Sequence, residues 1–229
     1  LTMAGLAPVP DDATRTRPGQ VQGDDVLRRI ADLRSGDPER QKRALRAASP
    51  DPALVAHVLP LLGRSETLRD AVRALRFVAP RAIGQLQDAM LDPRVDPAVR
   101  RRVPRVLKTC SMRRAADALF AALADPDLGL RSEAARALAA LTAADAALRM
   151  PREPVLDAVR RELDSGRTPE SLDHAFVLLS LVLEREALRT AAASLRGADA
   201  ALRGTALEYL DNVLPRDLAR RFEARFAGG

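Results

Sequence analysis

The chain has 229 residues, of which 47% are hydrophobic but only 3% aromatic, and its formal net charge is +6. Its one cysteine, Cys110, excludes a disulfide framework and a cysteine-ligated zinc site, and favours a reducing compartment such as the cytoplasm. The longest mostly apolar run, Ala175 to Leu183, is far shorter than the ~20 residues that a membrane-spanning helix requires. Alanine and leucine supply most of the expected core, which suits closely packed helices better than a sheet.

In chain order, residues 1–22 are predicted to form a flexible N-terminal tail or linker, because they contain three prolines and no helical period. Residues 23–229 are predicted to form a single solenoid domain of about six helical hairpins. We expect these hairpins at 24–35 with 37–49, 52–63 with 66–79, 80–91 with 96–109, 111–124 with 127–142, 152–165 with 168–184, and 186–197 with 199–213. A capping helix near 215–227 would close the C-terminal end.

Asp-Pro pairs mark the expected starts of four helices: Asp37-Pro38, Asp51-Pro52, Asp96-Pro97 and Asp125-Pro126. At such a start the carboxylate accepts hydrogen bonds from backbone N–H groups that have no partner within the helix. The proline adds no further unpaired N–H group to the first turn.

Between the fourth and fifth hairpins, the segment from Ala143 to Pro154 looks like an inserted loop. Such a loop would change the curvature of the array or offer a binding loop. Ordinary drift between repeats explains it equally well.

An Arg-Ala-Leu phrase, with small variations, recurs at almost constant spacing. It begins at Arg43, Arg73, Arg105 and Arg136, so the steps are 30, 32 and 31 residues. A period of this length is typical of a solenoid of stacked helical hairpins. One amphipathic hairpin cannot bury its apolar face alone, so the repeats are expected to stack on one another.

The segment from Asp125 to Leu138 is an Asp-Pro turn followed by an arginine and then by a small-small-x-Ala-Leu core. It resembles the second-helix signature of HEAT repeats (HEAT/PBS-lyase-like). Residues 96–100 match the opening of this signature, residues 201–207 match it more loosely, and the resemblance covers roughly 24–213. It implies an all-α fold, a right-handed αα superhelix of the HEAT/armadillo-like solenoid type.

The resemblance also implies roles for particular residues. Arg100, Arg131 and Arg203 would be the family's structural arginines, which bond to neighbouring turns. The fifth repeat departs from the pattern, because Asp173-His174 stands where that arginine is expected. The segment 202–215 is similar to the end of HEAT arrays attached to bacterial transporter-like membrane proteins, which would imply a cytoplasmic module of a larger membrane protein.

Basic residues at equivalent positions of successive second helices form the main candidate site. In a HEAT solenoid the second helices usually line the concave surface, so these residues would align into one basic ridge that binds a partner's carboxylates or phosphates. The ridge consists of Arg43, Arg46, Arg73, Arg76, Arg101, Arg105, Lys108 and Arg136. Its column ends at Glu208, so any anion site is expected to favour the N-terminal two thirds. The other interpretation is a solvated face whose arginines pair locally with Asp and Glu.

The positive charge has two explanations. Arginine carries nearly all of it, because Lys42 and Lys108 are the only lysines. A pI near 10.7 is typical of proteins with an anionic partner, such as nucleic acid, an acidic protein or lipid headgroups. A GC-rich coding sequence would also produce an excess of arginine and alanine.

No residues of the sequence are placed to act together as acid, base, nucleophile or metal ligand. His57 and His174 are the only histidines and lie over a hundred residues apart, so no metal-ligand spacing is present. No phosphate loop or nucleotide fingerprint appears, so neither a cofactor nor a metal is expected. Cys110 is expected to be a small core residue.

The favoured function is therefore a non-enzymatic protein-interaction scaffold or regulatory module. Its partner would be another protein or an adjacent domain of the same polypeptide, bound on the concave basic face. The alternative is a polyanion-binding module for nucleic acid or anionic lipid headgroups. A HEAT-type enzyme, such as a bilin-attaching lyase, is the least favoured reading. We expect the chain to be a monomer.

Overall fold

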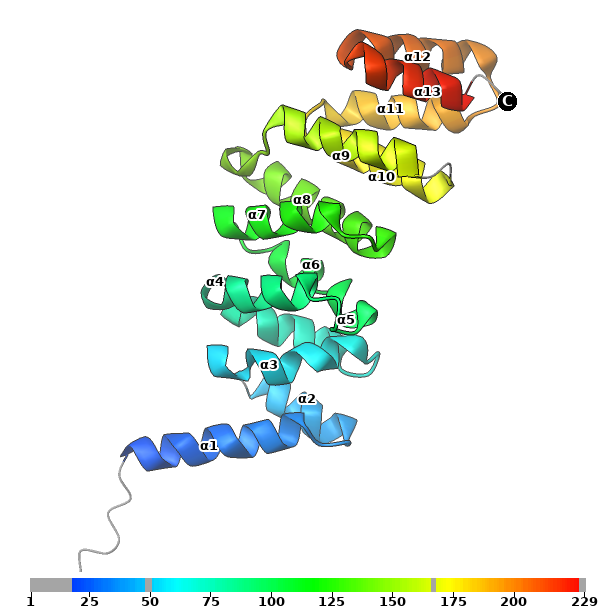
Figure 1. Cartoon of the computed structure of the whole chain (residues 1–229). Helices are drawn as coiled ribbons and strands as arrows, with labels where there is room; N and C mark the ends of the chain where they lie inside the picture. Colours follow the sequence, from blue (N-terminus) through cyan, green and yellow to red (C-terminus); the bar gives the residue numbers. More distant parts are fainter. Residues whose placement is uncertain (1–17, 48–50, 166–167, 227–229) are drawn as a thin grey trace, which may run out of the picture.

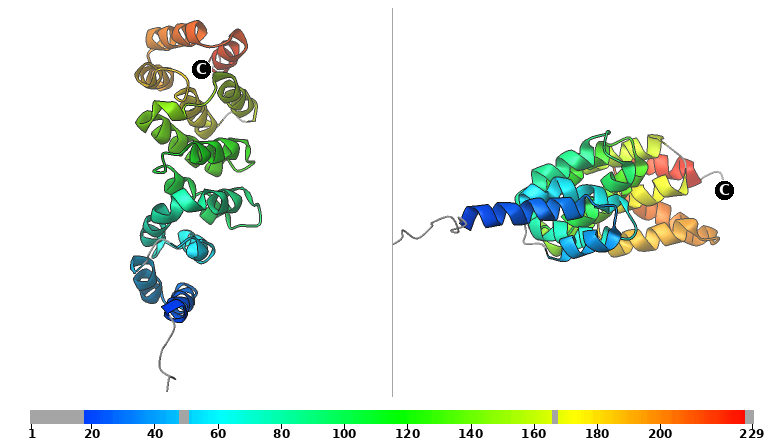
Figure 2. Two further views of the ribbon diagram at one scale, coloured as in Figure 1. Left: turned by 90° about the vertical axis from the view of Figure 1, so that its left-hand side faces the viewer. Right: turned by 90° about the horizontal axis from the view of Figure 1, so that it is seen from below.

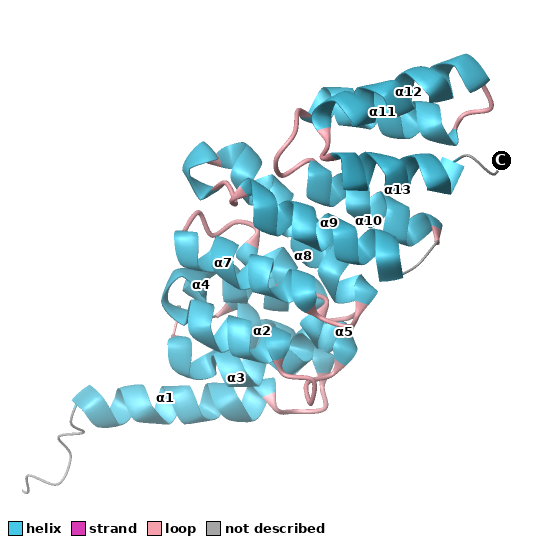
Figure 3. Ribbon diagram, turned by 45° about the horizontal axis from the view of Figure 1, so that its top comes forward, coloured by secondary structure: helices cyan, strands magenta, loops and turns pink. Residues whose placement is uncertain are grey.

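The structure is a computed structural model that describes residues 18–47, 51–165 and 168–226. Throughout these ranges the regular elements are helices, with no strand. The helices pack in neighbouring pairs, and the pairs stack into an elongated column that rises from α1 to α12 (Figure 1). Figure 3 shows the same arrangement with short loops between the helices. The prediction of an all-α helical repeat is confirmed.

The N-terminal half of the column contains irregular helices. Its elements are α1 (Pro18–Leu33), α2 (Pro38–Arg46), η1 (Pro52–Leu54), α3 (Val55–Val58), η2 (Leu59–Gly63), α4 (Leu68–Leu91), α5 (Pro97–Arg100) and α6 (Pro104–Leu107). Helix α1 begins at Pro18, inside the segment predicted as a tail, and residues 1–17 lie outside the described ranges.

The C-terminal half follows the expected boundaries more closely. Its elements are α7 (Arg113–Ala121), η3 (Ala122–Ala124), α8 (Leu128–Ala144), η4 (Ala146–Leu148), α9 (Arg152–Ser165), α10 (Pro169–Leu179), α11 (Arg185–Arg196), α12 (Ala200–Val213) and α13 (Arg216–Phe226).

Prolines explain where the N-terminal helices differ from expectation. The segments 66–79 and 80–91, expected as separate helices, are joined in α4 but remain two helical stretches, divided just after Pro80 by a kink at Ala82, whose backbone angles (φ −126°, ψ 18°) are not helical. The segment 96–109, expected as one helix, is divided into α5 and α6, and Pro104 opens α6. Pro60 lies similarly where α3 gives way to a 3-10 turn. In each case a proline lacks the N–H group that would continue the hydrogen-bond ladder.

Three of the four Asp-Pro pairs cap helices as predicted. The side chains of Asp37, Asp51 and Asp96 accept hydrogen bonds from backbone N–H groups two residues later, at 2.9, 2.9 and 2.7 Å. Asp125 does not cap α8. Asp127 does, accepting from the Gly129 N–H group at 2.9 Å, while Asp125 forms an ion pair with Arg100.

Arg100, Arg131 and Arg203 donate hydrogen bonds to neighbouring turns, and two of them also pair with a carboxylate of the next repeat. Arg100 is buried and donates to the Met90 carbonyl at 2.9 Å as well as to Asp125. Arg131 donates to Glu162 at 3.0 Å and to the Asp125 and Pro126 carbonyls, each at 2.9 Å. Arg203 donates to the carbonyl of Gly197 at 2.9 Å. The hydrogen bonds expected of these three arginines to neighbouring turns are therefore present.

The last three helices have an arrangement that the periodicity did not predict. Helix α13 turns back from the end of the column and runs parallel to α9, since Arg160 pairs with Asp217 and Asp164 pairs with Arg221. Helix α11 packs against α10, and α12 covers α11 and α13 from outside (Figure 1). Helices α11 and α12 thus form the expected sixth hairpin, and the closing helix α13 packs on α12 and pairs with α9.

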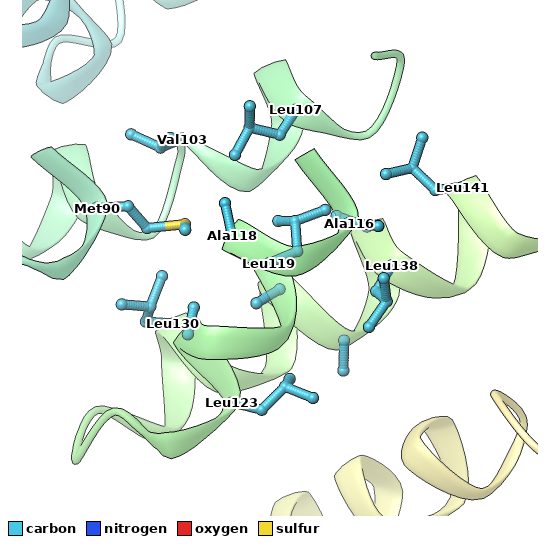
Figure 4. Close-up of a cluster of buried hydrophobic side chains, with 14 of the residues drawn as sticks. Met90, Val103, Leu107, Ala116, Ala118, Leu119, Leu123, Leu130, Leu138 and Leu141 are labelled. Atoms are coloured by element: carbon cyan, nitrogen blue, oxygen red, sulfur yellow. The ribbon is translucent and has the colours of Figure 1, made fainter. Parts of the chain in front are cut away.

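A continuous core of alanine and leucine runs through the column. In the middle of the stack, Met90, Leu107, Leu119, Leu130 and Leu138 meet from α4, α6, α7 and α8 (Figure 4), and each is fully buried. Small residues such as Ala134 and Ala135 are also fully buried, which lets neighbouring helices approach closely. This rigid core holds the side chains of the exposed faces at fixed spacings.

Candidate binding groove and basic ridge

Contacts from one repeat to the next link several members of the basic ridge. In the first step, Arg46 on α2 donates to both carboxylate oxygens of Asp70 on α4, at 3.3 and 3.2 Å. The guanidinium of Arg73 lies 3.6 Å from the same carboxylate. One carboxylate therefore lies between two arginines of successive repeats.

The ridge continues from α4 to α8 in the same way. Arg76 donates to the backbone carbonyl of Arg105, at 2.9 and 3.3 Å. The side chain of Arg105 lies 3.5 Å from Glu133, which also pairs with Arg136 at 2.9 Å. Arg43 and Lys108 are exposed at the two edges of this chain of contacts and form no ion pair with any described residue.

The side chain of Arg101, which follows α5, packs against the start of α8. It forms a bidentate pair with Asp127, with distances of 2.7 and 3.0 Å. A Cβ atom at Gly129 would lie 2.7 Å from the Arg101 Nε, so glycine leaves the room that this side chain fills. Burial disfavours the Asp127 carboxylate, but the hydrogen bonds from Arg101 and Gly129 outweigh it and lower the pKa of Asp127.

The ridge leads into a groove of about 1010 Å³ on the face formed by the second helices. Arg101, Arg102 and Arg105 lie at one end of the groove. Helices α8 and α10 form its floor, and α11 forms the opposite wall. Viewed from below, the α11–α12 hairpin lies to one side of the stack (Figure 2, right).

Positive charge predominates in the groove. Seven of its lining residues are arginines and four are carboxylates, a formal excess of three positive charges. The arginines are Arg101, Arg102, Arg105, Arg136, Arg185, Arg189 and Arg196, and the carboxylates are Asp127, Glu133, Glu170 and Asp173.

Several of the groove arginines keep their charge uncompensated. Arg102 donates to the backbone carbonyl of Leu62, and Arg185 donates to that of Ala139, so neither is neutralised by these bonds. Arg105 and Arg136 share the single negative charge of Glu133. Guanidinium groups in this state can donate hydrogen bonds to the carboxylate oxygens of a partner.

The sequence did not predict the contribution of α11. Arg185, Arg189 and Arg196 follow one another at helical spacing, so they share one face of α11, and all three line the groove. Glu208, expected to end the basic column, lies on α12 outside this row of helices. The groove therefore extends to residue 196, beyond the N-terminal two thirds that the sequence favours for an anion site.

His174 lies in the floor of the groove on α10 and is only 2% exposed. Neither ring nitrogen has a hydrogen-bond partner, and its Nε2 lies 3.7 Å from Glu162, whose carboxylate is already paired with Arg131. Burial, followed by the charges of Arg131 and Arg136, lowers the pKa of His174 to about 4. The imidazole is therefore neutral at pH 7.

The other residues considered for chemistry lie apart from the groove. His57 is half-buried in α3, and Cys110 is a buried free thiol whose pKa is raised by burial. Within the ranges that the structure describes, no three His, Cys, Asp or Glu side chains gather closely enough to hold a metal ion. In the same ranges, no helix has both the length and the apolar character needed to cross a membrane.

Comparison with known proteins gives structural likeness only. No protein-family model matches the chain, and no curated protein matches its sequence. Two crystal structures of engineered proteins from the Northeast Structural Genomics Consortium are similar to it. One is 22% identical with a TM-score of 0.38, covering 89% of this chain and 96% of its own. The other is 20% identical with a TM-score of 0.40, covering 88% of this chain and 61% of its own.

Proposed function

We propose that this chain is a non-enzymatic, HEAT-type protein-interaction module that binds an acidic segment of a protein partner or of a neighbouring domain in the same polypeptide. The observation that carries the proposal is the groove of about 1010 Å³, lined by seven arginines against four carboxylates. The basic ridge leads into this groove, so the two surfaces form one extended docking site. Complementary charge at such a site speeds association and excludes basic partners.

A protein partner fits the ridge better than a nucleic acid does, because carboxylates are interleaved with its arginines. Asp70 lies between Arg46 and Arg73, and Glu133 lies between Arg105 and Arg136. The evenly charged phosphate backbone of a duplex would be repelled by both of these carboxylates. A peptide can place its acidic residues opposite the arginines and neutral or basic ones opposite Asp70 and Glu133.

The proposal is tested by fluorescence anisotropy with a labelled twelve-residue oligoglutamate at 50 and 150 mM salt. The variant Arg105→Ala/Arg136→Ala removes two adjacent charges from the groove, and Arg161→Ala/Arg220→Ala is its matched control on the exposed faces of α9 and α13. We expect the groove variant to bind about tenfold more weakly, since two charge contacts at about 0.7 kcal/mol each give that factor. The control should stay within about twofold of the wild type.

A labelled 20-base-pair DNA duplex, titrated in parallel, separates the two candidate partners. The proposal predicts that a twelve-residue peptide of alternating glutamate and glycine, whose uncharged residues can face Asp70 and Glu133, binds more tightly than the duplex at 150 mM salt. Tighter binding of the duplex, with a steep salt dependence, would instead support the polyanion-binding function. Equal peptide binding by the groove variant and the control would refute the proposed site. Far-UV circular dichroism of each variant verifies that the helices are intact.

A further inference from the structure

A second hollow, of about 700 Å³, lies beside the groove. One side is formed by the segment between α8 and α9, including Ala146, Arg149 and Met150. The other side is the turn from Ser180 to Arg185, which connects α10 to α11. This hollow is where the sequence suggested an inserted loop.

Hydrogen bonds hold the inserted segment against one side of this hollow. Asp145 caps the short 3-10 turn η4 by accepting from the Ala147 N–H group at 2.9 Å. Arg113 on α7 donates to the carbonyl of Ala147 at 2.7 Å and to that of Arg149 at 3.4 Å. Met150 is buried. These contacts fix the segment in place, so the Arg149 side chain projects from a fixed backbone.

The two hollows meet at Ser180 and Arg185, which line both. Arg185 is the first residue of α11, and its guanidinium reaches across to the carbonyl of Ala139 on α8. A chain that passes over Arg185 would therefore leave the groove and enter the second hollow directly. The Arg185 guanidinium would lie against that partner segment.

The second hollow is also basic. It is lined by Arg149, Arg152 and Arg185 against one carboxylate, Glu184. Glu184 caps α11 by accepting from two backbone N–H groups, at 2.9 and 2.6 Å, so much of its accepting capacity is already used. Arg149 is exposed, and its side chain forms no hydrogen bond or ion pair with any described residue. It is therefore free to bind a carboxylate.

We infer that the two hollows form one binding track, and that the partner segment is an extended acidic chain that crosses Arg185 and ends against Arg149. This inference rests on the proposed function and specifies the shape and length of the segment. The groove crosses α6, α8 and α10, two helix spacings or roughly 20 Å, which an extended chain covers with about six residues. The second hollow has about two thirds of that volume, which adds about four residues.

Two labelled oligoglutamates, of six and of twelve residues, test this track by anisotropy at 150 mM salt. Charge repulsion keeps both peptides extended. The test variant is Arg149→Glu, and Arg161→Glu is the matched control on α9. We expect Arg149→Glu to weaken binding of the twelve-residue peptide about tenfold and that of the six-residue peptide less than about twofold. Arg161→Glu should leave both peptides within about twofold of the wild type.

The possible results separate the inference from the proposed function. If Arg149→Glu leaves both peptides unaffected while Arg105→Ala/Arg136→Ala weakens both, the track is refuted and the groove remains. If Arg149→Glu weakens the binding of both peptides equally, the two hollows are not occupied one after the other by one chain. The inference is then also wrong. If neither variant has an effect, the proposed function itself fails. Circular dichroism and melting of Arg149→Glu should match the wild type, because this side chain makes no contact that supports the fold.

Discussion

Replacing His174 with leucine should make the protein more resistant to mild acid. In the folded chain the ring is 2% exposed and its pKa is lowered to about 4, against an ordinary value of 6.5. The neutral form is therefore favoured by folding. The free energy of unfolding that depends on a neutral His174 is fully present above pH 6.5 and is lost as the pH falls from 6.5 to 4.

The size of the effect follows from these two pKa values. At about 1.4 kcal/mol per pH unit, the full loss is about 3 kcal/mol, and about 2 kcal/mol of it has occurred by pH 5. Leucine has a similar volume and carries no ring nitrogens, which in His174 lack hydrogen-bond partners. His174→Leu should therefore be as stable as the wild type at pH 7, or more stable by about 1 kcal/mol.

Urea unfolding followed by far-UV circular dichroism at pH 7, 6 and 5 measures this difference. The stability difference between His174→Leu and the wild type should grow by about 2 kcal/mol between pH 7 and pH 5. Comparing the two proteins at each pH cancels the carboxylates common to both. Because the chain has only two histidines, NMR titration also reads His174 directly, with an expected midpoint near 4. Parallel stability curves for the two proteins, or a midpoint near 6.5, would refute the reasoning.

Three other substitutions or reactions test the packing. Arg100→Ala leaves Asp125 buried without its partner and should lower the unfolding free energy by about 3–5 kcal/mol in urea; a loss below about 1 kcal/mol would contradict this role. Phe222→Ala removes a fully buried ring whose centroid lies 5.5 Å from that of Phe176, and hydrogen exchange of α13 should accelerate by about 100-fold or more. Unchanged protection would mean that α13 is held by other contacts. Cys110, 4% exposed, should not react with Ellman's reagent until urea unfolds the chain, whereas rapid reaction of the native protein would contradict its burial.

Local signals in the sequence predicted the repeat architecture well. The recurrence of Arg43, Arg73, Arg105 and Arg136 indicated the period, and three of the four Asp-Pro pairs marked helix starts. These features depend only on residues close in the chain. The breaks near Pro60 and Pro104 were not predicted, since 52–63 and 96–109 were each expected as one helix, although an interior proline interrupts a helix.

The arrangement of the C-terminal helices could not be read from periodicity. It depends on contacts between distant residues, such as Phe222 against Phe176 and Arg160 against Asp217. The stripe of arginines on α11 was present in the sequence, but the face it would meet depended on that arrangement. The ridge was thus predicted from the repeat, while the α11 wall of the groove required the tertiary structure.

Zero-length carbodiimide coupling of the twelve-residue oligoglutamate tests most directly where an acidic segment binds. The reagent joins a carboxylate to an amine, and the chain has only two lysines. Lys108 is exposed on the ridge, one helical turn beyond Arg105, whereas Lys42 is paired with Glu39 at 2.8 Å. The account predicts that mass spectrometry finds the peptide attached mainly to Lys108, and that Arg105→Ala/Arg136→Ala reduces this product. Attachment to Lys42 alone, or equal yields from the variant and the wild type, would contradict it.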